Sequence, residues 1–199
     1  MLNLVMRRLL LTKLLLLAIL LTACTPSLFK VRPVSQLPAF PVDAESMDAG
    51  NVTVRVGSIV RDEESQHLFE VNLPVSGILA FRTELVFKTG TPVEIKNLRF
   101  SVRDAQGHDW KSLSAKKAVS RILKANEIRL YNPNSKKQFT QEFGSYALDS
   151  TAELSQSRPR LSGFLFFQSP KKESVNTTQQ FNLIIERLAP QPVTITVNK

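Results

Sequence analysis

Residues 162–169, SGFLFFQS, are the most informative stretch for the fold of this 199-residue chain. Four apolar residues follow one another from Phe164 to Phe167. Successive side chains of a strand point to opposite faces, so neither face of this strand would be polar. A strand that is apolar on both faces has to be covered on both. We therefore expect a buried strand here, with other elements packed on each side.

Two amphipathic segments before this strand can supply the cover for one face. Residues 114–124 carry apolar side chains at helical spacing after Ser114, a typical N-cap residue. Residues 136–148 repeat the pattern, with Ser135 as the cap and Phe139, Phe143, Tyr146 and Ala147 as the apolar stripe. The sequence predicts two short helices, packed on the outer face of the strand.

From Asn51 onward the dominant pattern is alternation with a period of two, which is typical of strands with one buried face. It is clearest in residues 52–56, 79–87, 181–186 and 193–197. These runs are bounded by Gly, Pro and Asn, which predicts a mainly β fold. The pattern resembles an antiparallel sandwich of immunoglobulin type, with the two helices inserted. The resemblance is one of pattern only, because the Cys and Trp signature of true immunoglobulin domains is missing.

The sequence also predicts a bend, a hairpin turn and a polar connection between the expected strands. The apolar set changes parity near Lys96 and Asn97, which predicts a bulge or bend. Asp104 and Gly107 indicate a hairpin turn whose second strand passes through Trp110. Residues 61–69, RDEESQHLF, are interpreted as a polar connection between strands.

The amino terminus has the layout of a secretory signal peptide. A positive region ending at Lys13 is followed by an apolar run from Leu14 to Leu21 and by small residues before Cys24. A transmembrane helix needs about 20 apolar residues, more than this segment offers. We interpret the segment as a cleaved signal, not a membrane span.

Residues 21–24, Leu-Thr-Ala-Cys, match the lipobox of bacterial lipoprotein precursors, which this terminus resembles. The resemblance implies cleavage between Ala23 and Cys24 and attachment of diacylglycerol to the sulfur of Cys24, the only cysteine. It also implies that Thr25, which is not Asp, directs the protein to the outer membrane. Two or more acyl chains make such an attachment stable, where one would be marginal.

The lipobox divides the chain into three expected parts. Residues 1–23 are the signal, residues 24–50 a lipidated tether interrupted by prolines, and residues 51–199 one β-sandwich domain. Part of the tether, LPAFPV, can alternatively lie against the domain as an irregular edge. Loss of the signal removes three basic residues and lowers the net charge from +9 to +6. This excess suits an anionic envelope component, and no basic-aromatic motif supports nucleic acid as a partner.

The sequence offers no strong catalytic or metal site. A zinc site needs three or four ligands, which two histidines and neighbouring acidic residues could supply in number. Their spacing in the sequence does not require them to come together. These residues are His67, Glu63, Asp104, His108 and Asp109. The adjacent Asp62, Glu63 and Glu64 are interpreted as solvated, and a Ser-His-Asp triad cannot be judged by counting. We expect no cofactor and no metal.

The most concentrated charge lies on the expected first helix. Its four basic residues are either a solvated face or a contact for an anionic surface: Lys116, Lys117, Arg121 and Lys124. The leading hypothesis is a lipid-anchored envelope lipoprotein that acts as a non-enzymatic binding or accessory module. The alternatives are an envelope hydrolase acting on glycan or peptide, and a structural part of a secretion or surface-appendage apparatus.

Overall fold

The structure is a computed structural model that describes residues 28–128 and 133–197. The expected signal peptide and the lipobox lie outside these residues. Within the described ranges, no helix combines the length and the apolar character that crossing a bilayer requires.

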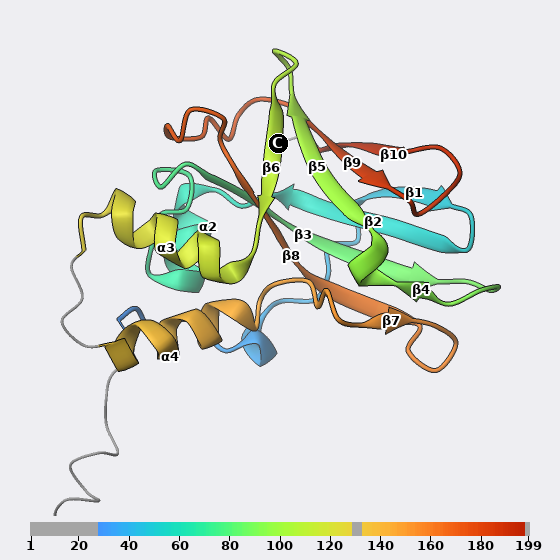
Figure 1. Cartoon of the computed structure of the whole chain (residues 1–199), viewed down its shortest axis with the longest axis horizontal. Coiled ribbons are helices and arrows are strands. Elements are labelled where there is room, and N and C mark those ends of the chain that lie inside the picture. The colour runs from blue at the N-terminus through green and yellow to red at the C-terminus, as the bar shows by residue number, and fades with distance from the viewer. Residues whose placement is uncertain (1–27, 129–132, 198–199) are drawn as a thin grey trace, which may run out of the picture.

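Eight strands form one antiparallel sheet in the order β1-β2-β3-β8-β6-β5-β9-β10 (Figure 1). Their bounds are β1 (Glu45–Ala49), β2 (Val52–Ile59), β3 (Ile78–Phe87), β5 (Arg99–Asp104), β6 (Asp109–Leu113), β8 (Arg160–Gln168), β9 (Phe181–Glu186) and β10 (Val193–Val197). A separate pair joins β4 (Val93–Glu94) and β7 (Glu153–Leu154). The helices are α2 (Asp62–Phe69), α3 (Ala115–Ala125) and α4 (Pro133–Gly144), with 3-10 turns η1 (Val34–Gln36) and η2 (Ile95–Asn97).

The mainly β, antiparallel architecture with two inserted helices is confirmed, but the two-sheet immunoglobulin sandwich is not what forms. The large sheet curves until β10 lies close to β1 and β2, which gives a barrel-like shape. Inward side chains from all eight strands share one core cluster. Alternation of apolar and polar residues predicts which side chains face inward. The same alternation occurs when a strand packs against a second sheet and when it packs against the far side of its own curved sheet.

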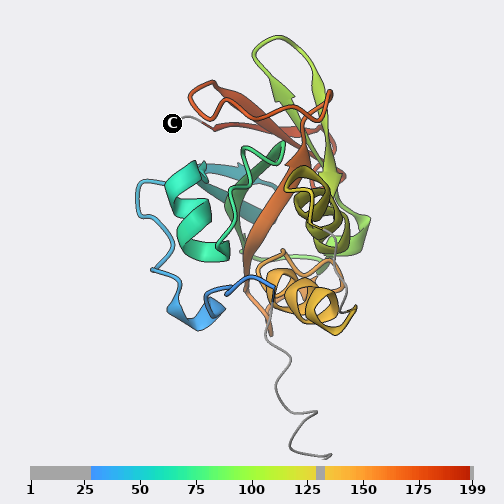
Figure 2. The same cartoon turned by 90° about the vertical axis from the view of Figure 1, so that its left-hand side faces the viewer.

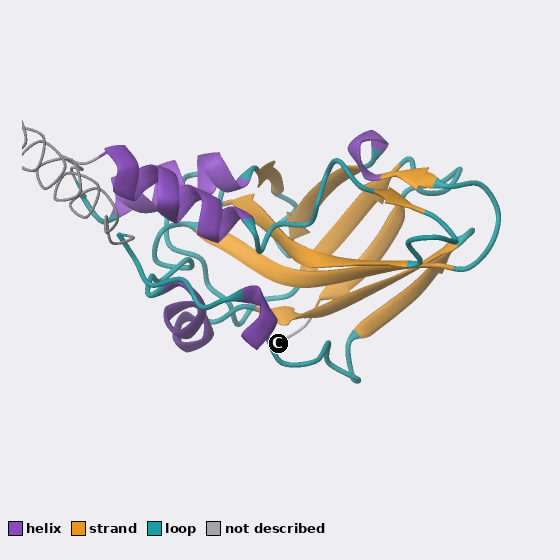
Figure 3. Ribbon diagram, turned by 90° about the horizontal axis from the view of Figure 1, so that it is seen from below, coloured by secondary structure: helices purple, strands orange, loops and turns teal. Residues whose placement is uncertain are grey.

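The expectation for residues 162–169 is confirmed. Leu165 and Phe167 point into the barrel-like core, whereas Phe164 and Phe166 belong to a second core cluster on the outer face. The ring of Phe143, from α4, lies 4.8 Å from that of Phe166. Helices α2, α3 and α4 cover this outer face at one end of the molecule, as Figures 2 and 3 show. The double-sided apolar strand is therefore the element on which both cores meet.

Both predicted helices form, with small differences at their ends. Helix α3 begins after Ser114, whose Oγ accepts a hydrogen bond from the Lys117 backbone N–H at 3.4 Å. Helix α4 begins earlier than expected, at Pro133, a residue favoured in the first helical position. It ends at Gly144, so Tyr146 and Ala147 follow the helix instead of extending its stripe.

The interpretation of residues 61–69 as a polar connection is wrong, because Asp62–Phe69 form α2. Only three of its residues are buried, Ser65, Leu68 and Phe69, which is too few to give a clear helical stripe in the sequence. Phe69 packs against Tyr146 at 4.9 Å between ring centroids. Tertiary contacts with other elements therefore stabilise this helix, and the local pattern of apolar residues does not predict it.

The expected change of parity and the expected hairpin are both present. The 3-10 turn η2 separates β4 from β5 at the predicted position. In the hairpin, Arg103 of β5 pairs with Asp109 of β6. Gly107 adopts a φ of +85° in the turn, a conformation that favours glycine.

The described part of the expected tether lies against the domain, so the alternative of an ordered edge describes it better. Residues 45–49 are strand β1. The guanidinium of Arg82 donates to Pro38 O at 2.7 Å, and that of Arg55 donates to Pro41 O at 2.8 Å. The ring of Phe40 lies 4.9 Å from the Arg55 guanidinium and 5.1 Å from that of Arg82. These contacts between distant residues override the proline-rich local sequence.

Candidate functional site

A hollow in the described surface arises where β5 and β6 separate. The two strands pair only from Ser101 to Arg103 on β5. Beyond that point β6 keeps only the pairing with β8 on its other edge, through Ser112 and Leu113. Strand β5 meanwhile stays paired with β9 as far back as Arg99. The wall of the sheet therefore divides into two arms with a groove between them.

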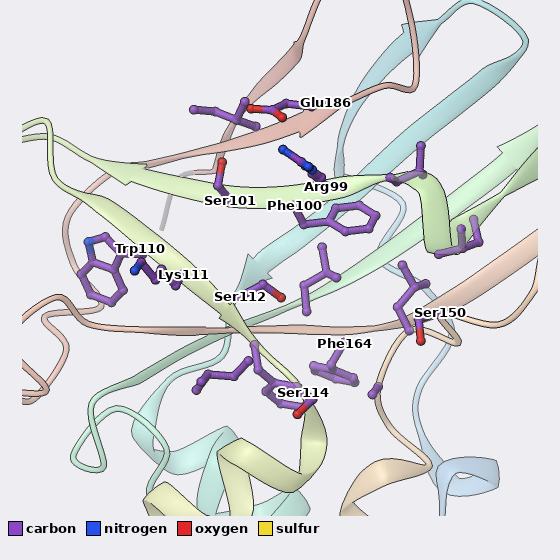
Figure 4. A pocket seen from close by; sticks show the side chains of 18 of the residues that line it. Arg99, Phe100, Ser101, Trp110, Lys111, Ser112, Ser114, Ser150, Phe164 and Glu186 are labelled. Carbon is purple, nitrogen blue, oxygen red and sulfur yellow. The ribbon is translucent and has the colours of Figure 1, made fainter.

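This groove has a volume of about 1330 Å³ and is open to solvent. Its apolar lining comes from both arms and from the chain after α4, and Figure 4 shows Phe100, Ser112, Ser150 and Phe164 around the same space. Phe100 and Leu113 are half-buried. The groove thus offers aromatic and aliphatic contact surface next to the hydrophobic core.

The polar lining of the groove is rich in hydroxyl groups and charged residues. The serines are Ser101, Ser112, Ser114, Ser145 and Ser150. Arg103 Nε donates to Asp109 Oδ1 at 2.8 Å, and this hydrogen bond holds the pKa of Asp109 below its ordinary value. The side-chain and backbone hydrogen bonds of Thr151 likewise lower the pKa of Asp149. Both carboxylates are therefore ionised and already bonded at neutral pH, which does not suit a general acid.

Asp104 is a buried structural carboxylate at the base of the β5–β6 hairpin. Its Oδ1 accepts from the His108 backbone N–H at 2.8 Å, and its Oδ2 accepts from Trp110 Nε1 at 3.0 Å. The His108 ring lies beside it, with Nδ1 at 3.1 Å from Oδ2. Burial opposes ionisation of Asp104, but the hydrogen bonds from Trp110 and His108 outweigh it. The pKa of Asp104 therefore lies below its ordinary value of 3.8.

The residues that could be drawn as a zinc site on paper are not brought together. His67 lies on α2, where its Nδ1 is 3.2 Å from the Arg32 guanidinium, and His108 lies in the hairpin beside Asp104. In the described ranges, no group of three or more potential metal-ligating side chains converges. Asp62, Glu63 and Glu64 occupy the first turn of α2, where the helix dipole favours negative charge.

The four basic residues of α3 do not form one equivalent set. Lys116, Lys117 and Lys124 are exposed. Arg121 is half-buried, and its Nε donates to Ser76 O at 2.9 Å while its Nη2 donates to Lys172 O. Arg121 therefore bridges α3 to two loops, and only the three lysines are placed to meet an anionic surface.

Sequence reasoning identified Trp110 and the hairpin but missed the groove. Its apolar contributors, such as Phe100 and Leu113, follow the period-two pattern of ordinary strands. The only local signal is the shortness of β6, whose five residues run directly into the Ser114 cap. That shortness marks where β6 ends, but it does not say where β6 and β5 stop pairing.

Comparisons with known proteins add little to this geometry. No family model and no curated protein matches the chain. Among solved structures, the chain is similar to a DUF4426 family protein from Pseudomonas aeruginosa PAO1, with 9% sequence identity and a TM-score of 0.32. The match covers 78% of this chain and 94% of that one. A similarity at this level carries no argument about fold or function.

Proposed function

We propose that this chain is a lipid-anchored envelope lipoprotein whose β domain binds an extended segment of another envelope protein, without catalysing a reaction. The observation that carries the binding proposal is the groove between the two arms of the sheet. The anchor and the outer-membrane location come from the resemblance of residues 21–25 to lipoprotein precursors.

The groove suits an extended peptide because it is bordered by strand edges. Ladder pairs between β5 and β6 stop at Ser101 and Lys111, although both strands continue. In the described chain, Phe100 therefore has no ladder partner on the β6 side, and Ser112 has none on the β5 side. An added strand gains backbone hydrogen bonds at such edges, while pockets receive alternate side chains.

The lining is also compatible with this class of ligand. Phe100, Leu113 and Phe164 provide apolar contact, and five serine side chains provide donors and acceptors. Aromatic residues, including phenylalanine, are enriched at protein interfaces. General acid–base hydrolysis instead needs acidic groups that converge across a cleft. Asp109 and Asp149 of the groove are bonded to Arg103 and Thr151 and have lowered pKa values, so neither suits the role of general acid in a hydrolase.

The anchor is tested by metabolic labelling with a radioactive fatty acid. Label should appear in the full-length chain and should be lost in the Cys24→Ala variant. Incorporation that persists in the variant would refute Cys24 as the lipidated residue.

The groove is tested by site-specific photo-crosslinking of the full-length chain in cells. A photoreactive residue at Ser112 should give an adduct with one defined envelope protein, with the crosslink in an extended segment of that protein. The same residue at Ser157, an exposed position in the β7–β8 connection, serves as the control. Identical adducts at both positions, or no adduct at Ser112, would contradict the groove as a peptide site.

A further inference from the structure

The first described residues are fastened to the helical end of the domain. The ring of Phe29 packs on Phe139 of α4, with 4.9 Å between ring centroids. The hydroxyl of Tyr146, which follows α4, donates to Arg32 O at 2.6 Å. Leu28 itself packs against the outer core cluster. Among the described residues, the chain therefore lies beside α4 from Leu28 to Arg32.

This early attachment limits how far the domain can stand from a lipid on Cys24. Four residue steps separate Cys24 from Leu28, and a fully extended chain spans at most about 3.6 Å per residue. The two Cα atoms can thus be no more than about 14 Å apart. That reach is shorter than the domain, so the end of the molecule at α4 is held close to the membrane surface.

We propose that α4 and residues 28–32 form the membrane-facing surface of the domain, and that they contact an anionic phospholipid leaflet. This inference rests on the proposed lipidation of Cys24. It replaces the picture of a domain held away from the membrane on a long tether. It also gives the anchored domain a fixed orientation.

The charges at this end of the domain fit an anionic leaflet. Lys30, Lys136 and Lys137 are exposed, and we call these three residues the lysine surface. None of the ion pairs among the described residues involves them. Attraction of basic residues to an anionic leaflet acts within about a Debye length, roughly 8 Å at physiological ionic strength. The short reach from Cys24 allows the lysine surface to come within this distance of the leaflet.

The opposite end of the molecule provides an internal control for this orientation. The β4–β7 pair lies at the far end of the long axis from α4, as Figures 1 and 3 both show. Gln156 is exposed in the connection from β7 to β8, and Gln141 is exposed on α4. The same substitution of these two glutamines therefore compares the proposed near side with the far side.

The experiment uses the mature lipidated chain in vesicles of phosphatidylcholine and phosphatidylglycerol that contain a lipid with a quencher in its headgroup. A fluorophore is attached to Cys in either Gln141→Cys or Gln156→Cys. The label on Gln141→Cys should be strongly quenched and the label on Gln156→Cys should not. Equal quenching at both positions, or stronger quenching at position 156, would overturn the orientation.

Flotation of the same samples separates the two hypotheses. A lipidated chain should float with the vesicles whatever its orientation, whereas a chain that stays in the dense fraction refutes the anchor itself. A chain that floats but leaves the Gln141→Cys label unquenched refutes the membrane-facing surface alone.

The role of charge is tested by reversing two of the lysines. The K136E/K137E variant should float normally but lose much of the quenching of the label at position 141. Raised salt should likewise reduce this quenching when the lysine surface is unchanged. The matched control is K88E/K96E, which reverses two exposed lysines beside the β4–β7 pair at the far end of the molecule and should leave quenching unchanged. An equal loss in the control, or no loss in K136E/K137E, would refute the lysine surface.

Discussion

Gly163 of β8 lies so close to Leu148 that a Cβ on the glycine would approach the Cα and the backbone N of Leu148 at 2.5 Å. The backbone explains this contact, because the Leu148 N–H donates to Phe164 O at 3.0 Å and the Phe164 N–H donates to Tyr146 O at 2.6 Å. The chain after α4 thus takes the place beside β8 beyond Leu113, the last residue of β6. Its position fixes both the helical cover and one wall of the groove.

Gly163→Ala should destabilise the domain by about 3 kcal/mol, because the added methyl overlaps backbone atoms that cannot move aside easily. Unfolding by urea measures the loss. Gly57→Ala is the control, since a Cβ there would meet its nearest neighbours at 3.7 Å, an ordinary contact. Equal stability of the two variants would contradict the close approach at Gly163.

Asp104→Asn should cost about 2 kcal/mol at neutral pH, since hydrogen bonds to a charged acceptor are stronger than those to a neutral one. The pKa of Asp104 is lowered in the folded state, so its contribution is complete above the ordinary value of 3.8 and is lost as the pH falls through the folded pKa. Trp110, the only tryptophan, reports unfolding. The difference in the free energy of unfolding between the unsubstituted protein and Asp104→Asn should shrink from pH 5 toward pH 2. A difference that stays constant over this range would contradict the role of Asp104.

Thr83→Val should stabilise the domain by about 1 kcal/mol. The Thr83 hydroxyl is buried, and it has no hydrogen-bond partner in the described parts of the chain. An unsatisfied buried hydroxyl costs free energy that a methyl group does not. Thr53→Val on the neighbouring strand is the control, because its hydroxyl donates to Asp48 and its loss should not stabilise. Thermal unfolding of both variants checks the sign.

Phe40→Ala should loosen the segment before β1, because Phe40 is the ring on which the guanidiniums of Arg55 and Arg82 lie. Limited proteolysis should cut residues 28–44 faster in this variant, with little change in the rest of the domain. Val42→Ala is the control in the same segment, since Val42 is 96% exposed and its side chain contributes little packing. Faster cleavage in the Val42 variant as well would show that Phe40 is not specifically responsible.

For the proposed outer-membrane lipoprotein, the sorting rule implied by the resemblance predicts that Thr25→Asp moves the chain to the inner membrane. Density-gradient separation of the two membranes measures the distribution. Thr25→Ser is the matched control and should stay in the outer membrane. The same distribution for Thr25→Asp and Thr25→Ser would contradict the predicted location.

The sequence by itself determined the features that depend on local pattern. Alternation placed most strands, the double-sided apolar run at Phe164 to Phe167 required cover on both faces, and Ser114 marked the start of α3. Each of these follows from the spacing of side chains along a strand or helix.

Only the tertiary structure decided how the strands close, where the groove lies and how the segment before β1 packs. The choice between a sandwich and a curved sheet depends on which strand edges meet, and identical alternation permits both. The groove exists because β6 separates from β5 while it stays paired with β8, and Phe40 is held by Arg55 and Arg82. These contacts join residues that are far apart in the chain, so a local sequence pattern cannot predict them.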